Sequence, residues 1–222
     1  MRFDIITIFP DIFESYFSES LIEKAQKAGL IEINVHDLRD YSQNKWGDVD
    51  DKPYGGGRGM VIKLEPIYRA VKDVKDEKLQ SKVVFFTPRG EKYSQKKAME
   101  YSETDQLIMI CGRYEGVDER VRTDLADESI SIGNYVLIGG EIPAMAVVES
   151  VSRLVDGVVG IDNEGFLDER VVEGGMVEYP QYTRPEVFET DEGEKWEVPE
   201  VLLSGHHKKI EDWRNKKGKK IK

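Results

Sequence analysis

The stretch of residues 111–141 constrains the fold of this chain more than any other part of its sequence. A short apolar run at residues 107–110 leads into the sequence CGRYEG, and a second apolar run at residues 135–138 leads into two adjacent glycines. Both runs have the composition of short strands, and a segment rich in acidic residues separates them. Glycine lets the backbone turn tightly and lets a ligand approach bare N–H and C=O groups. Two such junctions side by side therefore predict a pocket walled by backbone, which suits a flat, neutral heterocycle such as adenine.

The alternative for either junction alone is an ordinary turn between a strand and a helix. The two junctions together, with Tyr114, Glu115 and Glu141 spaced around them, favour a binding pocket over that alternative. Plain packing has no use for a pocket walled by backbone, so we interpret these residues as part of a functional site.

Apolar strand-like runs alternate with helical patterns along the first 160 residues. Strands are expected at residues 5–9, 31–38, 83–86 and 107–110, and helices at residues 11–28, 64–74 and 94–101 and from about Pro143 onward. This alternation predicts an α/β fold with a mainly parallel sheet. Ligands of such sheets bind at the carboxyl ends of the strands, which is where residues 87–90, 112–116 and 132–140 fall.

The composition of the chain changes near residue 160. We therefore expect a main domain over residues 1–160 and a polar, glycine-punctuated linker over residues 161–175. A small helical C-terminal domain is expected over residues 176–222, with a terminal helix at residues 205–217.

Composition excludes several classes of protein. No apolar run approaches the roughly 20 residues of a membrane span, and the short N-terminal apolar run is interrupted by Asp4, unlike a signal peptide. The single cysteine, Cys111, excludes an internal disulfide framework and fits a reducing compartment. Three histidines and one cysteine make a zinc site improbable, so no metal ligands are assigned. These features predict a cytoplasmic protein.

Charge is distributed unevenly along the chain. Residues 208–222 hold eight Lys or Arg and two acidic residues, a net charge of +6, which leaves −17 for the rest of a chain whose total is −11. An acidic body argues against a general nucleic-acid binder, but a basic tail can still bind phosphates locally. The alternative is a solvated, frayed terminus.

The glycine-rich run at residues 54–59, YGGGRG, resembles a phosphate-binding loop but lacks the Lys-Ser/Thr of a P-loop, and no strand immediately precedes it. It is better interpreted as a flexible loop that contacts an RNA backbone or closes a site, or as a mobile surface turn.

Two further features allow a catalytic and a bland interpretation. Arg153 lies near the end of a helix, where a cation also stabilises the helix dipole. The acids of the linker, Asp162, Glu164, Asp168 and Glu169, include a possible general base, but linker acids are more commonly solubilising charge.

With these motifs taken together, the chain resembles the bacterial tRNA (guanine-N1)-methyltransferases of the SPOUT class. The matching stretches occur in the order of that family over nearly the whole chain: IFPDIF, VDDKPYGGGRGM, TPRG, CGRYEGVDERV, SIGNYVLIGGEIPAM, SVSRLVDGV, YPQYTRPEV and WEVPEVLLSGHH. The resemblance implies methylation of N1 of the guanosine just 3′ of the anticodon, position 37 of the tRNA, an activity that supports reading-frame maintenance.

The resemblance also implies a fold and partners that the residue patterns do not reveal. A deep trefoil knot over residues 85–140 would hold the methyl donor S-adenosylmethionine in a bent conformation. The family is homodimeric, with each active site between two subunits, and it acts on tRNA rather than on DNA or at a membrane. It is associated with Mg²⁺, although no carboxylate cluster in this sequence indicates a site.

Carried over by motif, the resemblance implies a donor-binding set that consists mainly of loop residues. These are Thr87, Pro88, Gly112, Tyr114, Glu115, Ile132, Gly133, Asn134, Tyr135, Val136, Leu137, Gly139, Gly140 and Pro143.

The resemblance implies that Arg153 is the catalytic arginine and that Asp168 is the general base. The linker here is about two residues longer than the family pattern, so Glu169 is the alternate base. Guanine N1 bears a proton that a carboxylate must remove, and a guanidinium stabilises the charge that then builds on O6.

The chain departs from the family pattern in three other places. Asn134 stands where the family commonly has Asp, residues 189–195 look like an insertion, and the C-terminus ends early. Two rivals therefore remain: a SPOUT methyltransferase acting on ribosomal RNA or a ribose oxygen, and a non-catalytic protein that binds RNA or a metabolite.

Overall fold

The computed structural model describes residues 1–159 and 177–220, and the chain divides into two compact units, residues 1–167 and 168–222. None of the helices in the described ranges has the length and hydropathy needed to cross a bilayer. The linker expected at residues 161–175 lies outside the described residues.

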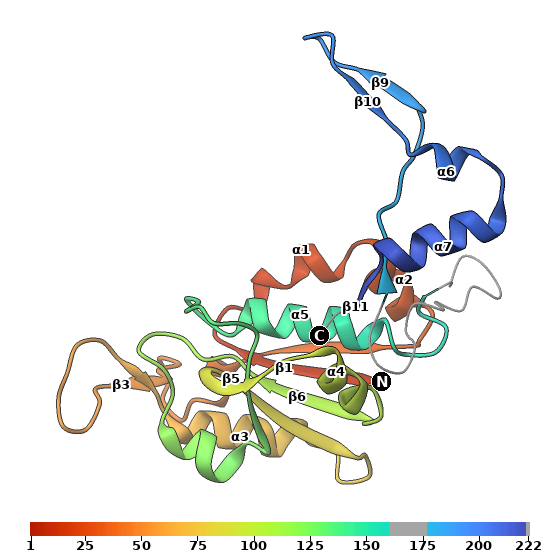
Figure 1. Ribbon diagram of the computed structural model, residues 1–222. Coiled ribbons are helices and arrows are strands. Elements are labelled where there is room, and N and C mark those ends of the chain that lie inside the picture. The colour runs from red at the N-terminus through yellow and green to blue at the C-terminus, as the bar shows by residue number, and fades with distance from the viewer. Residues whose placement is uncertain (160–176, 221–222) are drawn as a thin grey trace. The chain divides into compact units, whose positions relative to one another are not determined.

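A five-stranded parallel sheet forms the centre of the first unit (Figure 1). In spatial order its strands are β2 (Glu32–Asp37), β1 (Arg2–Thr7), β6 (Gln106–Ile110), β5 (Ser81–Lys92) and β7 (Glu128–Ser131). Each of the four pairings is parallel. The predicted α/β fold with a mainly parallel sheet is confirmed.

Both faces of the sheet are covered, so its central strand is buried throughout. Figure 1 shows α1, α2 and α5 on one side of the sheet and α3 on the other. Leu107 and Met109 of β6 pack on the first side, and Ile108 and Ile110 pack on the second, as the alternation of side chains along a strand requires. The bounds are α1 Glu14–Phe17, α2 Ser20–Lys27, α3 Leu64–Val74, α4 Gln95–Ser102 and α5 Glu141–Ser152.

The helix expected at residues 11–28 is divided into three pieces. A 3₁₀ turn, η1 (Pro10–Ile12), is followed by α1 and then by α2, which begins at Ser20 with φ of 57°. That left-handed backbone conformation cannot continue a right-handed helix. The helices expected at residues 64–74 and 94–101 are confirmed as α3 and α4.

The strand expected at residues 135–138 is wrong. The fifth strand is instead β7, within the segment that the sequence presents as an acidic connection. Strand β7 tolerates Glu128 because Lys82 lies 2.7 Å from one carboxylate oxygen and Tyr101 donates a hydrogen bond of 2.8 Å to the other. Val136 and Ile138, by contrast, are 83% and 85% exposed, so apolar composition there does not mark a buried strand.

The expected end of the third strand at residues 87–90 is also wrong, because β5 continues to Lys92 through a bulge. Phe86 and Glu91, on either side of the bulge, are both paired with Ile130 of β7. A Cβ atom on Gly90 would lie 2.5 Å from the backbone nitrogen of Ile130, so only glycine permits this approach. The bulge leaves residues 87–89 free to line a cavity.

The sequence predicts a helical second unit, but the structure shows strands as well as helices there. Its elements are β8 (Val177–Glu178), β9 (Val187–Glu189), β10 (Lys195–Glu197), α6 (Glu200–Leu203), α7 (His207–Lys217) and β11 (Lys219–Lys220). Strands β9 and β10 form an antiparallel hairpin, and β8 pairs with β11. The hairpin turn falls within residues 189–195, the segment interpreted as an insertion. Tyr182 and Trp213 pack with ring centroids 6.2 Å apart, which ties the start of this unit to α7.

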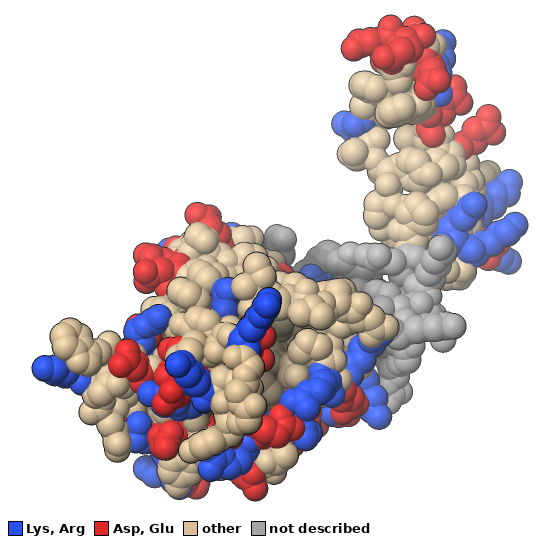
Figure 2. Space-filling view, turned by 90° about the vertical axis from the view of Figure 1, so that its left-hand side faces the viewer, with Lys and Arg blue, Asp and Glu red and all other residues tan. Residues whose placement is uncertain are grey.

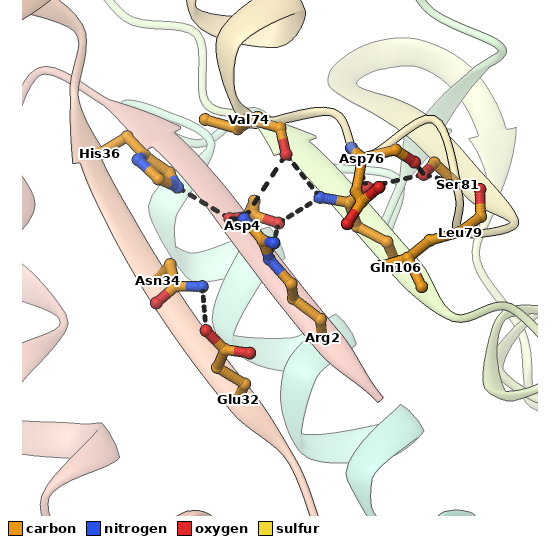
Figure 3. Close-up of polar contacts among 10 residues, drawn as sticks. All are labelled: Arg2, Asp4, Glu32, Asn34, His36, Val74, Asp76, Leu79, Ser81 and Gln106. Carbon is orange, nitrogen blue, oxygen red and sulfur yellow. Dashed lines mark hydrogen bonds and ion pairs between the residues drawn. The ribbon is translucent and has the colours of Figure 1, made fainter.

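A buried carboxylate anchors the amino-terminal ends of the strands. Asp4 of β1 is fully buried and lies 2.8 Å from Nε2 of His36, and it accepts hydrogen bonds of 3.0 Å from Arg2 and 2.6 Å from Gln106 (Figure 3). Gln106 also donates a hydrogen bond of 2.8 Å to the carbonyl of Val74, at the end of α3. This network joins β1, β2, β6 and α3 at the edge of the sheet opposite to the strand ends that bind ligands in such folds.

Replacing Asp4 by Ala is expected to lower the free energy of unfolding by about 3 kcal/mol near neutral pH, because Arg2 and His36 lose their buried partner. Burial by itself raises the pKa of the Asp4 carboxyl group, but the hydrogen bonds with His36, Arg2 and Gln106 outweigh burial and hold this pKa below its ordinary value. The stabilisation is therefore present above the unfolded pKa of about 3.9 and is lost as the pH falls through the folded pKa.

Urea unfolding of the wild type and of Asp4→Ala at about pH 7 and about pH 3 measures this effect. The difference between the two proteins should shrink at the lower pH. A difference of the same size at both pH values would contradict the assignment of this stability to the ionised carboxylate.

Candidate active site

A cavity of about 360 Å³ lies at the bulge of β5 and at the carboxyl ends of β6 and β7. Its walls come from the bulge at residues 87–89, the loop at residues 112–117 and the segment at residues 130–140. This volume is within the range of small-molecule sites, about 300–1,000 Å³. The position agrees with the expectation that residues 87–90, 112–116 and 132–140 meet at one edge of the sheet.

Thirteen of the fourteen residues expected to bind the donor line this one cavity. They are Thr87, Pro88, Gly112, Tyr114, Glu115, Ile132, Gly133, Tyr135, Val136, Leu137, Gly139, Gly140 and Pro143. Asn134 is exposed and is not among the lining residues. The structure brings the thirteen lining residues together, and their role in donor binding stays a prediction.

The two glycine-containing segments, at residues 111–116 and 135–140, lie in direct contact. The backbone N–H of Gly140 donates a hydrogen bond of 3.0 Å to the carbonyl of Gly112. A Cβ atom on Gly140 would lie 2.6 Å from Cα of Cys111, so glycine is required for this approach. The expectation of adjacent junctions is confirmed, although only the first of them follows a strand.

The structure contains a buried ion pair at the cavity wall, between Arg113 and Glu141, that the sequence did not predict. Glu141, at the start of α5, is 2% exposed. Its carboxylate accepts hydrogen bonds of 2.9 Å from Nε of Arg113 and 2.9 Å from the hydroxyl of Thr7, at the end of β1. The guanidinium of Arg113 also lies 4.8 Å from the ring centroid of Phe9. The only sequence signal was the position of Glu141 directly after the two glycines, and it did not identify a partner.

A second arginine at the cavity is also paired with a carboxylate. Nη2 of Arg89 lies 2.5 Å from Glu119, and Nε of Arg122 lies 2.5 Å from the other oxygen of the same carboxylate. The hydrogen bonds from Arg122 and Arg89 hold the pKa of Glu119 below its ordinary value. This cluster is largely exposed, so solvent screens it strongly.

Cys111 is buried beside Gly140 and is not among the residues that line the cavity. Complete burial raises the pKa of its thiol well above the ordinary value, and the nearby Glu141 carboxylate raises it further. A protonated, buried thiol behaves as a small apolar side chain.

The glycine-rich run at residues 54–59 lies between two short antiparallel strands, β3 (Asp50–Asp51) and β4 (Val61–Ile62). A P-loop joins a strand to a helix, so this arrangement agrees with the rejection of a P-loop. The N–H of Glu115 donates to the carbonyl of Met60 at 3.1 Å, and the N–H of Ile62 donates to the carbonyl of Gly116 at 3.0 Å. These bonds fix the base of the glycine-rich run beside the cavity loop.

The proposed catalytic residues are not brought to the cavity within the described part of one chain. Arg153 follows the last residue of α5, is exposed and does not line the cavity. Asp168 and Glu169 lie outside the described residues. Within residues 1–159 and 177–220, no group of three or more His, Cys, Asp or Glu side chains could hold a metal ion.

The fold and the cavity define a class: an α/β protein with a cavity of ligand-binding size, walled largely by loop residues, at the ends of parallel strands. The family model described as tRNA (Guanine-1)-methyltransferase TrmD matches residues 1–221, and the chain belongs to this family. The resemblance noted in the sequence is thereby confirmed.

Individual relatives agree with the family match. The chain is 51% identical over 220 residues to a tRNA (guanine-N(1)-)-methyltransferase of Dictyoglomus turgidum, covering 99% of this chain and 86% of the relative. It is 50% identical over 216 residues to a protein of that name from a Geobacter species, covering 97% and 84%. A protein of that name from Geobacillus kaustophilus is 48% identical over 216 residues, covering 97% and 86%.

Proposed function

We propose that this chain transfers a methyl group from S-adenosylmethionine to N1 of the guanosine just 3′ of the anticodon in tRNA, in the cytoplasm. The observation that carries the proposal is the family match over residues 1–221, together with a cavity lined by thirteen residues of the expected donor-binding set. When bound, S-adenosylmethionine supplies an activated methyl group on a positively charged sulfur.

The cavity fits an adenosine-like donor. Its backbone-rich walls offer N–H and C=O groups to the edge of a base, and Ile132, Leu137 and Pro143 offer apolar contacts to its faces. Gly140 and the bulge before Gly90 keep these walls close without filling the space between them. The residues present therefore suit the donor that the family implies.

The acceptor chemistry falls to the residues carried over by motif. Asp168, or Glu169 as its alternate, removes the proton from guanine N1, and Arg153 stabilises the negative charge that develops on O6. The target guanine must leave its stack in the tRNA to reach the cavity. No role is proposed for Mg²⁺, because the described residues contain no group of acidic or histidine side chains that could hold it.

We further propose that the protein acts as a homodimer with each active site between two subunits. Three apolar side chains near the cavity, Val136, Ile138 and Ile142, are 83%, 85% and 56% exposed, and a second copy would remove them from water. The absence of Arg153 from the cavity lining of its own chain fits a site completed by a partner. A purely monomeric species in analytical ultracentrifugation at assay concentrations would argue against it.

The knot that the family implies for residues 85–140 is part of the same proposal. Two features support it: Ile130 of β7 is paired on both sides of the β5 bulge, and Gly140 returns to the backbone of Gly112. An experimental electron-density map in which residues 85–140 follow an unthreaded path would rule it out.

Contacts with the RNA backbone are proposed for residues 55–59, Tyr182, Arg184 and the basic residues 208–222. The Lys and Arg side chains of α7 are exposed, and Figure 2 shows basic side chains together on the α7 part of the second unit and acidic ones at its hairpin end. Phosphate contacts of this kind weaken as salt is raised.

Methyl transfer to two tRNA transcripts tests the proposal directly. One transcript has guanosine just 3′ of the anticodon and the other has adenosine there, and the donor carries a labelled methyl group. Label is expected only on the guanosine transcript. Label on neither transcript, with donor binding intact, would favour a non-catalytic binding protein, and label on both would point to a different RNA target.

A further inference from the structure

The charges around the cavity are arranged in a specific way. Four Arg or Glu side chains line the cavity: Arg89, Arg113, Glu115 and Glu119. Each arginine is paired with a carboxylate, Arg89 with the exposed Glu119 and Arg113 with the buried Glu141. Glu115 has no ion-pair contact with another described residue. The cavity therefore presents no uncompensated positive charge from these arginines.

The pair formed by Arg113 and Glu141 matters more than the exposed pair. The side chains of Arg113 and Glu141 are only 18% and 2% exposed, so solvent screens their charges weakly. The hydroxyl of Thr7 donates to the second oxygen of Glu141, and the start of α5 adds its helix dipole. Both carboxylate oxygens of Glu141 therefore accept a hydrogen bond.

The ligand that the proposed function assigns to this cavity changes charge during the reaction. S-adenosylmethionine carries a positive sulfonium centre, and its product S-adenosylhomocysteine carries a neutral thioether instead. The two molecules are otherwise nearly the same size. An unpaired cation on the cavity wall would therefore weaken binding of the positively charged donor much more than binding of the neutral product.

We propose that Glu141 determines specificity between donor and product: its buried carboxylate cancels the charge of Arg113, so that the cavity accepts the positively charged methyl donor. The inference rests on the proposed function, because it assumes that the donor binds in this cavity. The alternative is a purely structural role in which Glu141 only ties α5 to the ends of β1 and β6.

Calorimetric binding of S-adenosylmethionine and S-adenosylhomocysteine to Glu141→Gln separates these roles. Glutamine keeps the shape and an oxygen that accepts from Arg113, and the contact with Phe9 keeps the guanidinium in place. The charge of Arg113 is then uncompensated. We expect the ratio of donor Kd to product Kd to rise by about tenfold.

Two further variants sharpen the test. Glu149→Gln removes the same charge from the exposed part of the same helix, where Glu149 accepts a hydrogen bond from Tyr16, and it should leave the ratio unchanged. Glu141→Gln combined with Arg113→Gln removes both charges and should bring the ratio back toward the wild-type value. Arg113→Gln alone leaves an uncompensated carboxylate and should shift the ratio in the opposite direction, in favour of the donor.

The possible outcomes are distinct. Equal weakening of both ligands in Glu141→Gln, with the ratio unchanged, would overturn the inference and leave a structural role. If Glu141→Gln fails to fold, an unchanged ratio in Arg113→Gln overturns it instead. If the wild-type protein binds neither ligand, that result contradicts the proposed function itself and not only the role of Glu141.

Discussion

Replacing Gly140 by Ala is expected to weaken binding of S-adenosylmethionine by at least about tenfold and to destabilise the fold by about 1–3 kcal/mol. The added methyl group would lie 2.6 Å from Cα of Cys111 and 3.1 Å from the backbone nitrogen of Gly112. Both neighbours are main-chain atoms, so neither can rotate away, and the two walls of the cavity must separate. Calorimetry with the donor and urea unfolding measure the two effects.

Gly112→Ala is the matched control for stability. Its methyl group would meet only side-chain atoms of Val117 and Phe85, at 3.4 Å and 3.5 Å, which is close to ordinary contact. Gly112→Ala should therefore unfold at nearly the wild-type urea concentration. Equal stability of the two variants would show that the contact between the loops is looser than the structure indicates.

Replacing Asp168 by Ala is expected to lower the single-turnover rate constant for methyl transfer to guanosine by about 10²–10⁴-fold, because proton removal from N1 then depends on water. Arg153→Ala should cause a loss of similar size, because the charge on O6 is no longer stabilised. Single-turnover assays with labelled donor measure both variants. The donor Kd should stay near the wild-type value, since neither residue is in the expected donor-binding set.

The longer linker makes Glu169 the comparison for this prediction. Glu169→Ala should retain most of the activity if Asp168 is the base, and the reverse pattern would identify Glu169 instead. Full activity in folded Asp168→Ala and Arg153→Ala proteins would refute both catalytic assignments.

Much of the fold could be anticipated because burial shows in local composition. The apolar run before Cys111 is buried on both sides as β6, and the helix at residues 64–74 has the predicted bounds. The cavity could be anticipated in two ways: residues 87–90, 112–116 and 132–140 were expected at the ends of strands, and the individual lining residues followed from the resemblance to the family. Asn134 shows the limit of that argument, since a residue within the same motif does not line the cavity.

The errors share a physical cause. Composition placed a strand at residues 135–138, yet the sheet takes residues 128–131, because Lys82 and Tyr101 lie where they can satisfy Glu128. Exposed apolar residues next to the cavity, Val136 and Ile138, resemble a strand in sequence but lie outside the sheet. The partners of Glu128 lie 46 and 27 residues away along the chain, so local composition does not reveal them.

The sequence by itself determined the α/β class, the two glycine-containing segments, the family and the set of loop residues that meet at the cavity. Only the tertiary structure decided which segment completes the sheet. It also decided that Glu141 accepts hydrogen bonds from Arg113 and Thr7, which lie 28 and 134 residues away along the chain. Local propensity and periodicity indicate which face of each segment is buried or exposed to solvent. The pairing of buried charges depends instead on which segments the folded chain brings together.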